Sequence, residues 1–370
     1  RAHLWERYSR QRSANLPLWA EITTALANDD RALAGQLLER HEDALPRYDR
    51  INAAVLVGDT RRAQSDAFEA QTFQPDDDQL NQQLVDTLLS FSDHAGIQHA
   101  SRRLNELSEE QTTARLHWAL NPRWSVDLDA SRTQRSIRDR SQLAAVDDER
   151  GIDAYLRWKN GNSSASFRAG RRESLDTYIP RQLQWEQRIE NRLRLRLEAG
   201  RQLPTEETTA MRLGGMKDRL GVGLTYQPTR LDTVSLEHFR DRYHLQTGAD
   251  IGRGHTTTLQ YMHALRGGTP SVDVGAFWSN FNFSERNLQS LSGRQLNILR
   301  YLPDSPASIP ANYLLPQSFQ YYGVVISTNQ RFMEEYTRAV RPFASLALTR
   351  HSREGSGYGL SVGLAGSVLG

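Results

Sequence analysis

Apolar and charged residues alternate one by one along residues 181–200, RQLQWEQRIENRLRLRLEAG. Leu195 and Leu197 lie on either side of Arg196, and the segment before this hairpin's turn alternates in the same way. Because successive side chains of a β-strand point to opposite faces, the spacing predicts strands with one apolar and one charged face. A sheet built from many such strands needs an apolar surrounding on one side and water on the other.

The same alternation recurs in short segments throughout residues 96–370. The connections at residues 121–122, 160–163 and 190–191 are tight, whereas those between them, such as 137–150, are longer. Short turns and longer outer loops are typical of outer-membrane barrels. At about 16 to 18 residues for each strand and its connection, the region predicts about 16 strands. The sequence therefore predicts an antiparallel transmembrane β-barrel with a polar lumen.

Two features of this pattern concern residues 216–218 and the aromatic residues near strand ends. Between Arg212 and Gly254, the alternation does not decide whether Met216-Lys217-Asp218 form a turn or part of a strand. Several aromatic residues near strand ends are expected in the girdles that barrels place at the membrane interfaces. These residues are Trp118, Trp124, Trp158, Tyr226 and Tyr243.

The composition excludes several classes of protein. The 370 residues hold 46 Lys and Arg against 44 Asp and Glu, so the balanced charge points to no nucleic-acid partner. No run approaches the roughly 20 apolar residues that a membrane-spanning helix needs. The sequence has no Cys, and no spacing of side chains typical of a metal site or of a phosphate-binding loop is present. We therefore expect neither a metal nor a cofactor.

Residues 1–95 carry helical patterns instead of strand patterns, and two blocks repeat at an offset of about 30 positions, close to the tetratricopeptide period. The positions that match the small-residue and proline pattern are Gly58, Ala63, Ala67, Ala70 and Pro75. We expect tetratricopeptide-like helical repeats over 1–95 and the barrel over 96–370, with a plain helical hairpin as the alternative. Two repeats bury little core, so more repeats are expected before Arg1.

Other all-β folds and enzymes fit the sequence less well. A soluble sandwich needs about 7 to 9 strands, roughly half the number expected. A small-solute porin would not need the helical repeats, and a soluble repeat scaffold with an all-β binding domain remains an alternative. Residues 359–363, GLSVG, match the G-x-S-x-G pattern of a nucleophile elbow. Ser361 stands inside an alternating strand with no helix after it, so we predict no enzyme.

The charged faces of the predicted strands supply the candidate lumen residues. These are Asp127, Asp129, Asp153, Arg157, Arg168, Glu186, Arg188, Arg194, Arg196 and Glu198. Opposite charges on neighbouring strands can pair, which predicts an ionic ladder along a wetted wall. The alternative is a surface that lets a hydrated polymer slide, since transport requires weak binding.

Residues 284–318 form the longest stretch without alternation and are rich in proline. Loops this long are usually functional or disordered. We expect either a mobile outer loop or a gate that folds into the pore. The candidate gate residues are Leu288, Leu291, Ile298, Leu299 and Tyr301.

The sequence resembles the PelB-like family of exopolysaccharide outer-membrane exporters. The resemblance rests on the small-residue pattern from Gly58 to Pro75, on residues 114–136, ARLHWALNPRWSVDLDASRTQRS, and on residues 357–370, GYGLSVGLAGSVLG. The exporters of alginate, cellulose and poly-N-acetylglucosamine share the plan. One departure is the end at Gly370, where barrels of this kind usually close on Phe or Trp. Either residues follow Gly370 or the closing signal differs.

The resemblance implies a function in biofilm matrix formation at the bacterial outer membrane. The implied substrate is a partly deacetylated amino-sugar polysaccharide. The implied partners are outer-membrane lipid, a lipoprotein ring, and polymer-modifying enzymes that contact the repeats in the periplasm.

Overall fold

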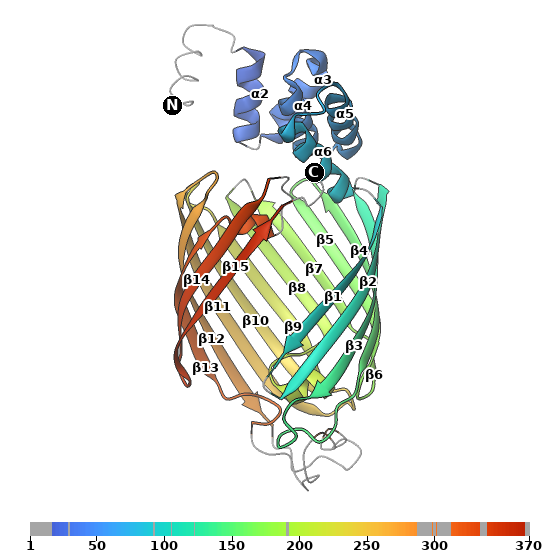
Figure 1. The fold of residues 1–370 in the computed structure, drawn as a ribbon, viewed down its shortest axis with the longest axis vertical. Coiled ribbons are helices and arrows are strands. Elements are labelled where there is room, and N and C mark those ends of the chain that lie inside the picture. The colour runs from blue at the N-terminus through green and yellow to red at the C-terminus, as the bar shows by residue number, and fades with distance from the viewer. Residues whose placement is uncertain are drawn as a thin grey trace.

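The computed structural model describes residues 17–366 except 29, 92, 105, 122, 190–191, 287–297, 299–300, 302–311 and 334–338. Helices lie together at one end of a curved antiparallel sheet, and the strands of this sheet form the wall of a barrel (Figure 1). We call the end of the barrel beside these helices the helical end and the opposite end the loop end.

The helices pack as successive antiparallel neighbours along the chain. Their bounds are α2 Leu18–Ala27, α3 Arg31–Arg40, η1 Glu42–Ala44, α4 Arg47–Val57, α5 Thr60–Phe73 and α6 Asp78–Phe91. Asp30 and Asp59 cap α3 and α5 by accepting backbone N–H groups three residues ahead, at 3.0 and 3.2 Å. Side-chain caps of this kind satisfy donors that the first helical turn leaves free.

Small residues let α4 and α5 approach closely. Gly58 ends α4 in the left-handed region, with φ of +84°, a conformation that suits glycine. Ala63 and Ala67 of α5 have no exposed surface. α5 ends at Phe73, two residues before Pro75. These positions behave as the small-residue pattern predicts, and no helix in the described part of the chain is long and apolar enough to span a membrane.

The strands follow one another around the sheet in chain order. Their bounds are β1 His94–Arg103, β2 Leu107–Asn121, β3 Trp124–Ile137, β4 Glu149–Asn160, β5 Ser163–Glu173, β6 Thr177–Tyr178, β7 Arg181–Ile189, β8 Leu193–Pro204, β9 Gly215–Tyr226, β10 Asp232–Leu245, β11 Asp250–Arg266, β12 Val272–Glu285, β13 Phe319–Thr328, β14 Arg341–His351 and β15 Gly355–Ala365. The described residues thus contribute 15 strands, close to the expected number, and the short β6 pairs with β5 beside the main path.

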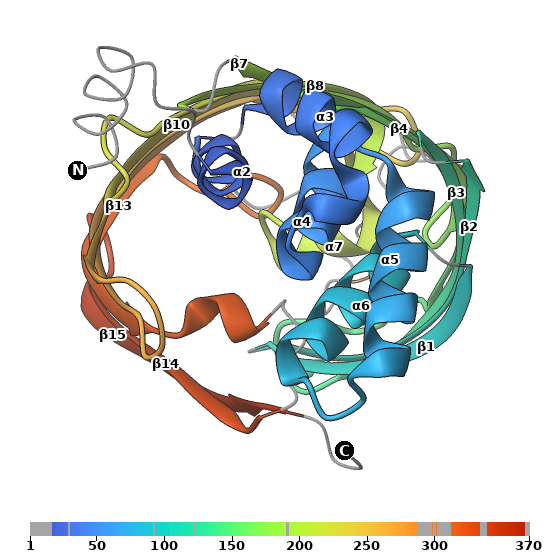
Figure 2. The same cartoon turned by 90° about the horizontal axis from the view of Figure 1, so that it is seen from above.

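The strands curve into a ring when the barrel is seen from the helical end (Figure 2). β1 and β15 are the two edges of the sheet, and no pairing between them occurs among the described residues. The tight β2–β3, β4–β5 and β7–β8 connections lie at the helical end, and the longer β3–β4, β5–β7 and β8–β9 connections lie at the loop end. The connection between β13 and β14 is a long exception at the helical end. This separation is the one expected for an outer-membrane barrel.

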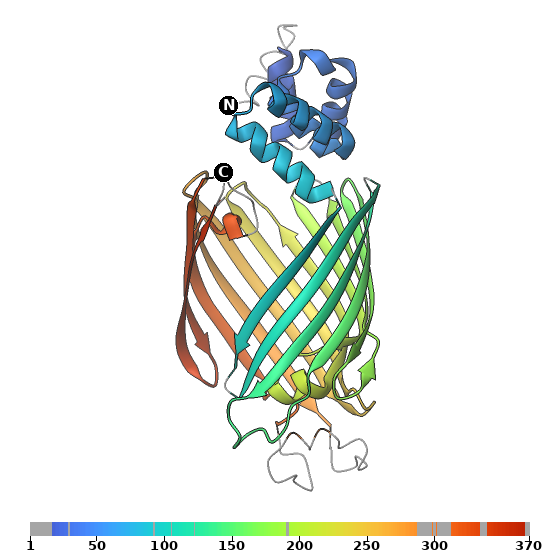
Figure 3. The same cartoon turned by 45° about the vertical axis from the view of Figure 1, so that its right-hand side comes forward.

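A very short link joins the helices to the wall. α6 runs down to the rim of the barrel, where β1 begins (Figure 3). The Asp93 carboxylate accepts the backbone N–H of Ala119 on β2 at 2.8 Å. A second contact joins Arg230, in the β9–β10 turn, to the Ala27 carbonyl at 3.5 Å. The helices therefore stand directly over the opening at the helical end.

The structure shows whether residues 216–218 form a turn or a strand, which the sequence did not decide. α7, Thr209–Gly214, is followed at once by β9, so Met216-Lys217-Asp218 belong to a strand. A short 3-10 helix, η4 Gln330–Met333, follows β13 at the helical end. Ser361 lies inside β15 opposite Ser345 of β14, which does not fit a nucleophile elbow.

Candidate functional site

The register of the strands separates the residues into an outer and an inner face. Trp185 pairs with Leu197, and the next pair along the same two strands is Glu186 with Arg196. Directly opposed residues of an antiparallel pair share a face, so the apolar pairs lie on one side and the charged pairs on the other. The apolar side carries exposed leucines, including Leu197 at 42% and Leu220 at 62%. It is the outer face, and the charged side is the lumen.

All ten predicted lumen residues lie on the inner face. Within it, Asp127, Asp129 and Asp153 are buried, at 3%, 8% and 2% exposure. Each is held by cations on neighbouring strands. Arg115 donates two bonds of 2.8 Å to Asp129. The His117 imidazole and the Arg157 guanidinium each lie 2.8 Å from the Asp127 carboxylate.

Two arginines bind Asp153, through three hydrogen bonds. Arg168 donates to it at 3.0 and 2.9 Å, and Arg172 donates at 2.7 Å. Forked guanidinium contacts with a buried carboxylate are the strong form of ion pair. Asp127, Asp129 and Asp153 are therefore structural parts of the wall, as in the ionic ladder expected from the sequence.

Most of the remaining predicted residues are more open to the lumen, but Glu198 is buried, at 7% exposure. Arg194 lies 3.3 Å from Glu186, with both side chains more than a third exposed. Arg196 reaches Glu198 at 3.2 Å. Arg188 pairs in register with Arg194 and joins no carboxylate among the described residues. Glu186 and Arg196, with Tyr155, Arg157 and Arg168, line a hollow of about 580 Å³ on the inner wall near the helical end.

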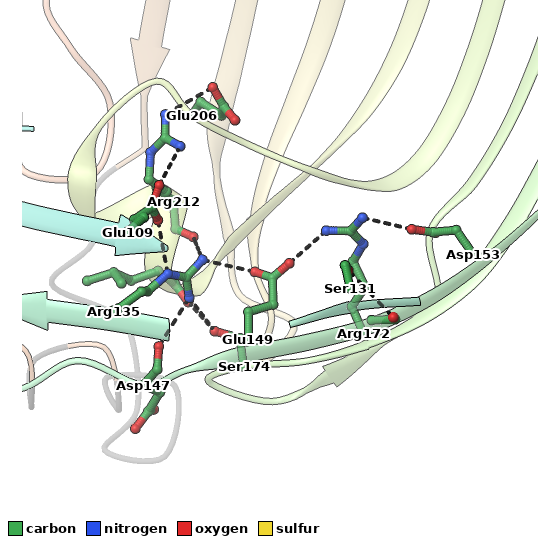
Figure 4. Close-up of polar contacts among 12 residues, drawn as sticks. Glu109, Ser131, Arg135, Asp147, Glu149, Asp153, Arg172, Ser174, Glu206 and Arg212 are labelled. Carbon is green, nitrogen blue, oxygen red and sulfur yellow. Dashed lines mark hydrogen bonds and ion pairs between the residues drawn. The ribbon is translucent and has the colours of Figure 1, made fainter. Parts of the chain in front are cut away.

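A second ionic network, which the sequence did not reveal, lies at the loop end (Figure 4). Arg135 is its centre, with only 4% of its side chain exposed. It donates to Glu109 and Glu149 at 3.0 Å each, and to Ser174 at 3.1 Å. Glu149 in turn accepts from Arg172 at 2.7 Å, which continues the network to Asp153. One chain of charges thus links β2, β3, β4 and β5.

An apolar core closes part of the loop end. Wall residues and loop residues meet there around α7, which lies within the ring of strands in Figure 2. The fully buried members are Leu107, Leu143, Ala210, Met211, Leu213, Tyr243, Leu245, Ala249, Ile251, Ile298, Tyr301, Leu314 and Leu315. An apolar cluster thus lies on the inner side of the wall at the loop end.

Two of the predicted gate residues belong to this core. Ile298 and Tyr301 have no exposed surface. The Tyr301 hydroxyl donates to Asp147 at 2.7 Å, and its carbonyl accepts from Ala144 at 2.8 Å. Both partners come from the β3–β4 connection. The other three candidates, Leu288, Leu291 and Leu299, lie outside the described residues.

Charged contacts fasten the segment around α7 to the wall. Arg212 donates to Glu109 at 3.2 Å, and Glu207 accepts from Lys217 at 2.6 Å and from Tyr243 at 3.0 Å. Burial opposes ionisation of Glu207, but the charge and hydrogen bond of Lys217 outweigh it, so the pKa of Glu207 is lowered from 4.5. Tyr243 therefore faces the core, and the prediction that it belongs to an interfacial girdle is wrong.

The lumen side of β12, β13 and β14 has a different chemistry from the ladder. In place of ion pairs it carries an aromatic strip, which we define as Phe277, Phe281, Phe283, Phe319, Tyr321 and His351. All six side chains are half-buried. The sequence signal was available, because aromatic residues recur at alternate positions of these strands, opposite in phase to the outward Trp278 and Tyr322.

The rings of the aromatic strip touch one another across the strands. The centroids of Phe281 and Phe319 are 4.5 Å apart, those of Phe319 and His351 4.4 Å, and those of Phe277 and Tyr321 5.3 Å. Phe277 lies over Gly323, where an added Cβ would come within 3.0 Å of the ring. Glycine thus leaves room for the Phe277 ring beside the wall.

Three solved structures are similar to the chain at low identity. A bacterial polysaccharide outer membrane secretin is 10% identical, with 70% of this chain and 77% of that chain covered and a TM-score of 0.48. BamA from Haemophilus ducreyi lacking POTRA domains 1–3 is 8% identical over 73% of this chain and 64% of its own, with a TM-score of 0.41. An anion-selective porin from Comamonas acidovorans is 8% identical over 75% and 96%, with a TM-score of 0.37.

No curated protein sequence matches the chain significantly. A match to a protein family covers residues 89–370, which include every strand of the barrel and the end of α6. The family is described as the C-terminal β-barrel domain of PelB. The chain belongs to the PelB C-terminal β-barrel family.

Proposed function

We propose that this outer-membrane barrel exports a partly deacetylated amino-sugar polysaccharide of the Pel type during biofilm matrix formation. Membership of a family of transport barrels, not of enzymes, agrees with the prediction made from the sequence. The observation that carries the proposal of a sugar polymer is the aromatic strip, because a channel for small ions has no need of a row of aromatic side chains along its wall.

Sugars and aromatic rings are complementary. The axial C–H groups of a pyranose are weakly positive, and the face of an aromatic ring is the negative side of its quadrupole. A protonated amino group is attracted to the same face by the cation–π interaction. A ring that lies over a glycine, as Phe277 lies over Gly323, would offer such a face while taking little room in the pore. The strip is thus suited to a partly cationic sugar chain.

The ionic ladder supports transport in another way. Its most buried carboxylates, such as Asp153, are neutralised by arginines. A wall whose charges are paired attracts neither sign of polymer strongly, and conduction needs binding that is weak enough for release. We therefore assign the contact with the moving polymer to the aromatic strip and the stiffness of the wall to the ladder. The plug around α7 and Ile298 would close the loop end until polymer arrives.

The helices belong to the same proposal. Residues 1–95 would lie in the periplasm as tetratricopeptide-like repeats and residues 96–370 would form the barrel in the outer membrane. The position of α6 over the helical end supports a role in guiding polymer from modifying enzymes to the lumen. A lipoprotein ring is the proposed partner at the outer membrane.

The test replaces rings of the aromatic strip without removing their volume. The variant Phe277→Leu/Phe281→Leu/Phe319→Leu keeps apolar side chains but removes three ring faces. In cells that carry the variant as their sole copy, we expect an assembled barrel and at least about tenfold less secreted polymer, if each lost stacking contact is worth about 0.5–1.5 kcal/mol.

The matched control removes rings from the opposite face of the same strands. Trp278→Leu/Tyr322→Leu changes two outward aromatic residues and should leave secretion by the assembled barrel unchanged. Equal secretion by the lumen variant and the wild type would refute a role of the strip. In planar bilayers, stronger current block by oligomers of cellulose, alginate or fully acetylated poly-N-acetylglucosamine than by partly deacetylated oligomers would assign a different polymer.

A further inference from the structure

The outer face changes character toward the loop end. Arginines take the place of the leucines there, and they stand in directly opposed pairs. Arg181 pairs with Arg201, and Arg242 pairs with Arg253. Like charges directly opposite each other on neighbouring strands destabilise a sheet. A directly opposed arginine pair that has no acidic neighbour is therefore expected to hold an anion from outside the chain.

The partners of these outward arginines differ from those of the arginines in the lumen. In the lumen, Arg115, Arg168 and Arg172 each hold a carboxylate at 3.0 Å or less. On the outer face, the Arg181 and Arg201 side chains have no carboxylate or hydrogen-bonding partner in the described parts of the chain. The contrast shows that the sheet supplies acidic partners inward and leaves these outward cations without them.

Two neighbours, Arg240 and Arg253, are also without a carboxylate among the described residues. Arg242 is the exception, because it donates to Asp250 at 2.6 Å. Two carboxylates beside these arginines already have partners. Asp218 accepts the backbone N–H of Gln202 at 2.9 Å and lies 3.5 Å from His244, and Asp241 accepts two bonds from Arg219 at 2.8 and 2.7 Å. Four guanidinium groups thus remain for a ligand.

These arginines line a groove of about 560 Å³ on β5 and β7–β11. The floor of the groove is apolar, formed by Phe167, Leu183, Ala199 and Leu220. Leu183 and Leu220 are 52% and 62% exposed, and they continue the lipid-facing surface of the barrel. Cationic groups therefore stand at one side of an apolar channel that opens toward the membrane.

We propose that this groove binds a phosphorylated glycolipid of the outer leaflet. Guanidinium groups bind phosphate through paired, charge-assisted hydrogen bonds, and the apolar floor takes the acyl chains. The assignment rests on the proposed orientation, in which the loop end faces outward and the arginines lie at the level of the outer headgroups. A free phosphate ion would satisfy the arginines but would leave the floor uncovered.

The experiment measures binding of bis-phosphorylated lipid A to the purified full chain in detergent by native mass spectrometry. The variant Arg181→Gln/Arg201→Gln should bind it at least about tenfold more weakly than the wild type, because two charge-assisted contacts are lost. The matched control is Arg132→Gln/Arg150→Gln. This is also an outward, directly opposed arginine pair, but it lies outside the groove, and its members have acidic neighbours in Asp148 and Glu173.

The control should bind within about twofold of the wild type, since it keeps the groove. Lipid A without its phosphates should bind as weakly to the wild type as lipid A does to the groove variant, and millimolar inorganic phosphate should not displace the lipid. Equal losses in both variants would show that binding follows total charge and would overturn the site. Displacement by inorganic phosphate would overturn the lipid assignment. Because no polysaccharide is present, these outcomes are independent of the export proposal.

Discussion

Arg212 of α7 and Glu109 of β2 form an ion pair, with 3.2 Å between Nη1 of the arginine and Oε2 of the glutamate, across 103 residues of sequence. The two side chains are only 12% and 8% exposed. The Arg212 carbonyl also accepts from Arg135 at 3.5 Å. The helix that lies inside the pore is thus fastened to the wall through its side chain and its backbone.

Removal of the Arg212 side-chain contact should loosen this plug. Loss of one partner from a buried ion pair costs about 3–5 kcal/mol. α7 is short and the wall has its own hydrogen bonds, so we expect Arg212→Gln to open the loop end and not to unfold the barrel. Single-channel conductance in planar bilayers should rise above that of the wild type.

The matched control is Arg102→Gln. Arg102 reaches Glu206 at 3.5 Å, but its side chain is 54% exposed, so conductance should stay at the wild-type level. If Arg212→Gln assembles normally and conducts like the wild type, α7 does not restrict the pore.

Acid should weaken the ion pair between Glu207 and Lys217, which is the second attachment of the segment around α7. The pKa of Glu207 is lowered from 4.5, so its ion pair with Lys217 is complete at neutral pH and is lost as pH falls through the lowered pKa. Conductance should therefore rise only when the pH falls well below 4.5, the ordinary pKa of a glutamate. Protonation also affects the hydrogen bond that Glu207 accepts from Tyr243 and the charge balance with nearby Asp241.

Two neighbouring residues allow this pH dependence to be assigned. Glu207→Gln should conduct at neutral pH as the wild type does in acid, with little further change. Glu206→Gln removes a carboxylate whose side chain is 62% exposed and should keep the acid response. An acid response that survives in Glu207→Gln would place the titrating group elsewhere.

The acidic residues of the lumen should differ in their effect on stability. Asp153→Asn removes the charge that Arg168 and Arg172 share and should lower the free energy of unfolding by about 3–5 kcal/mol. Glu186→Gln breaks a pair that is 39% and 48% exposed, and should cost only about 0–1 kcal/mol. Urea unfolding of both variants in detergent, followed by heat-modified gel mobility, gives the comparison. Equal losses would mean that burial does not distinguish these two pairs.

The outer face provides a test of the membrane assignment. Leu197 is 42% exposed and lies among the apolar outward residues of β8. An arginine near the bilayer midplane of a barrel costs about 2–4 kcal/mol, so Leu197→Arg should lower the yield of folded barrel in lipid vesicles. Arg201→Leu, on the same face of β8 but beyond the leucines, should fold normally. Normal folding of Leu197→Arg would argue against contact of this face with lipid.

Alternation in the sequence was enough to predict the two faces of most strands. Leu195 and Arg196 lie on opposite sides as expected, and the predicted lumen residues all face inward. The reason is physical: the two-residue period of a strand is local, so it can be read without knowing which strands are neighbours. The tight and long connections were predictable for the same reason.

Features that depend on contacts between distant segments were not predictable in this way. α7 is too short for a helical period, and its side chains find a core only because Ile298 and Tyr243 approach from other parts of the chain. Tyr243 was assigned to the wrong face because its strand has aromatic or charged residues on both sides. The aromatic strip was not predicted because β12 and β13 carry aromatic residues on both faces, so these residues do not distinguish the inner face from the outer one.

The most direct test of the account is the block of single-channel current by partly deacetylated amino-sugar oligomers of increasing length, applied from the helical end. If the lumen is the route of a sugar polymer, each oligomer should block the current reversibly, and the duration of a block should grow with oligomer length as more units meet the aromatic strip. The account would be contradicted if blocks were absent, or if their duration did not depend on length, in a barrel whose open conductance is intact.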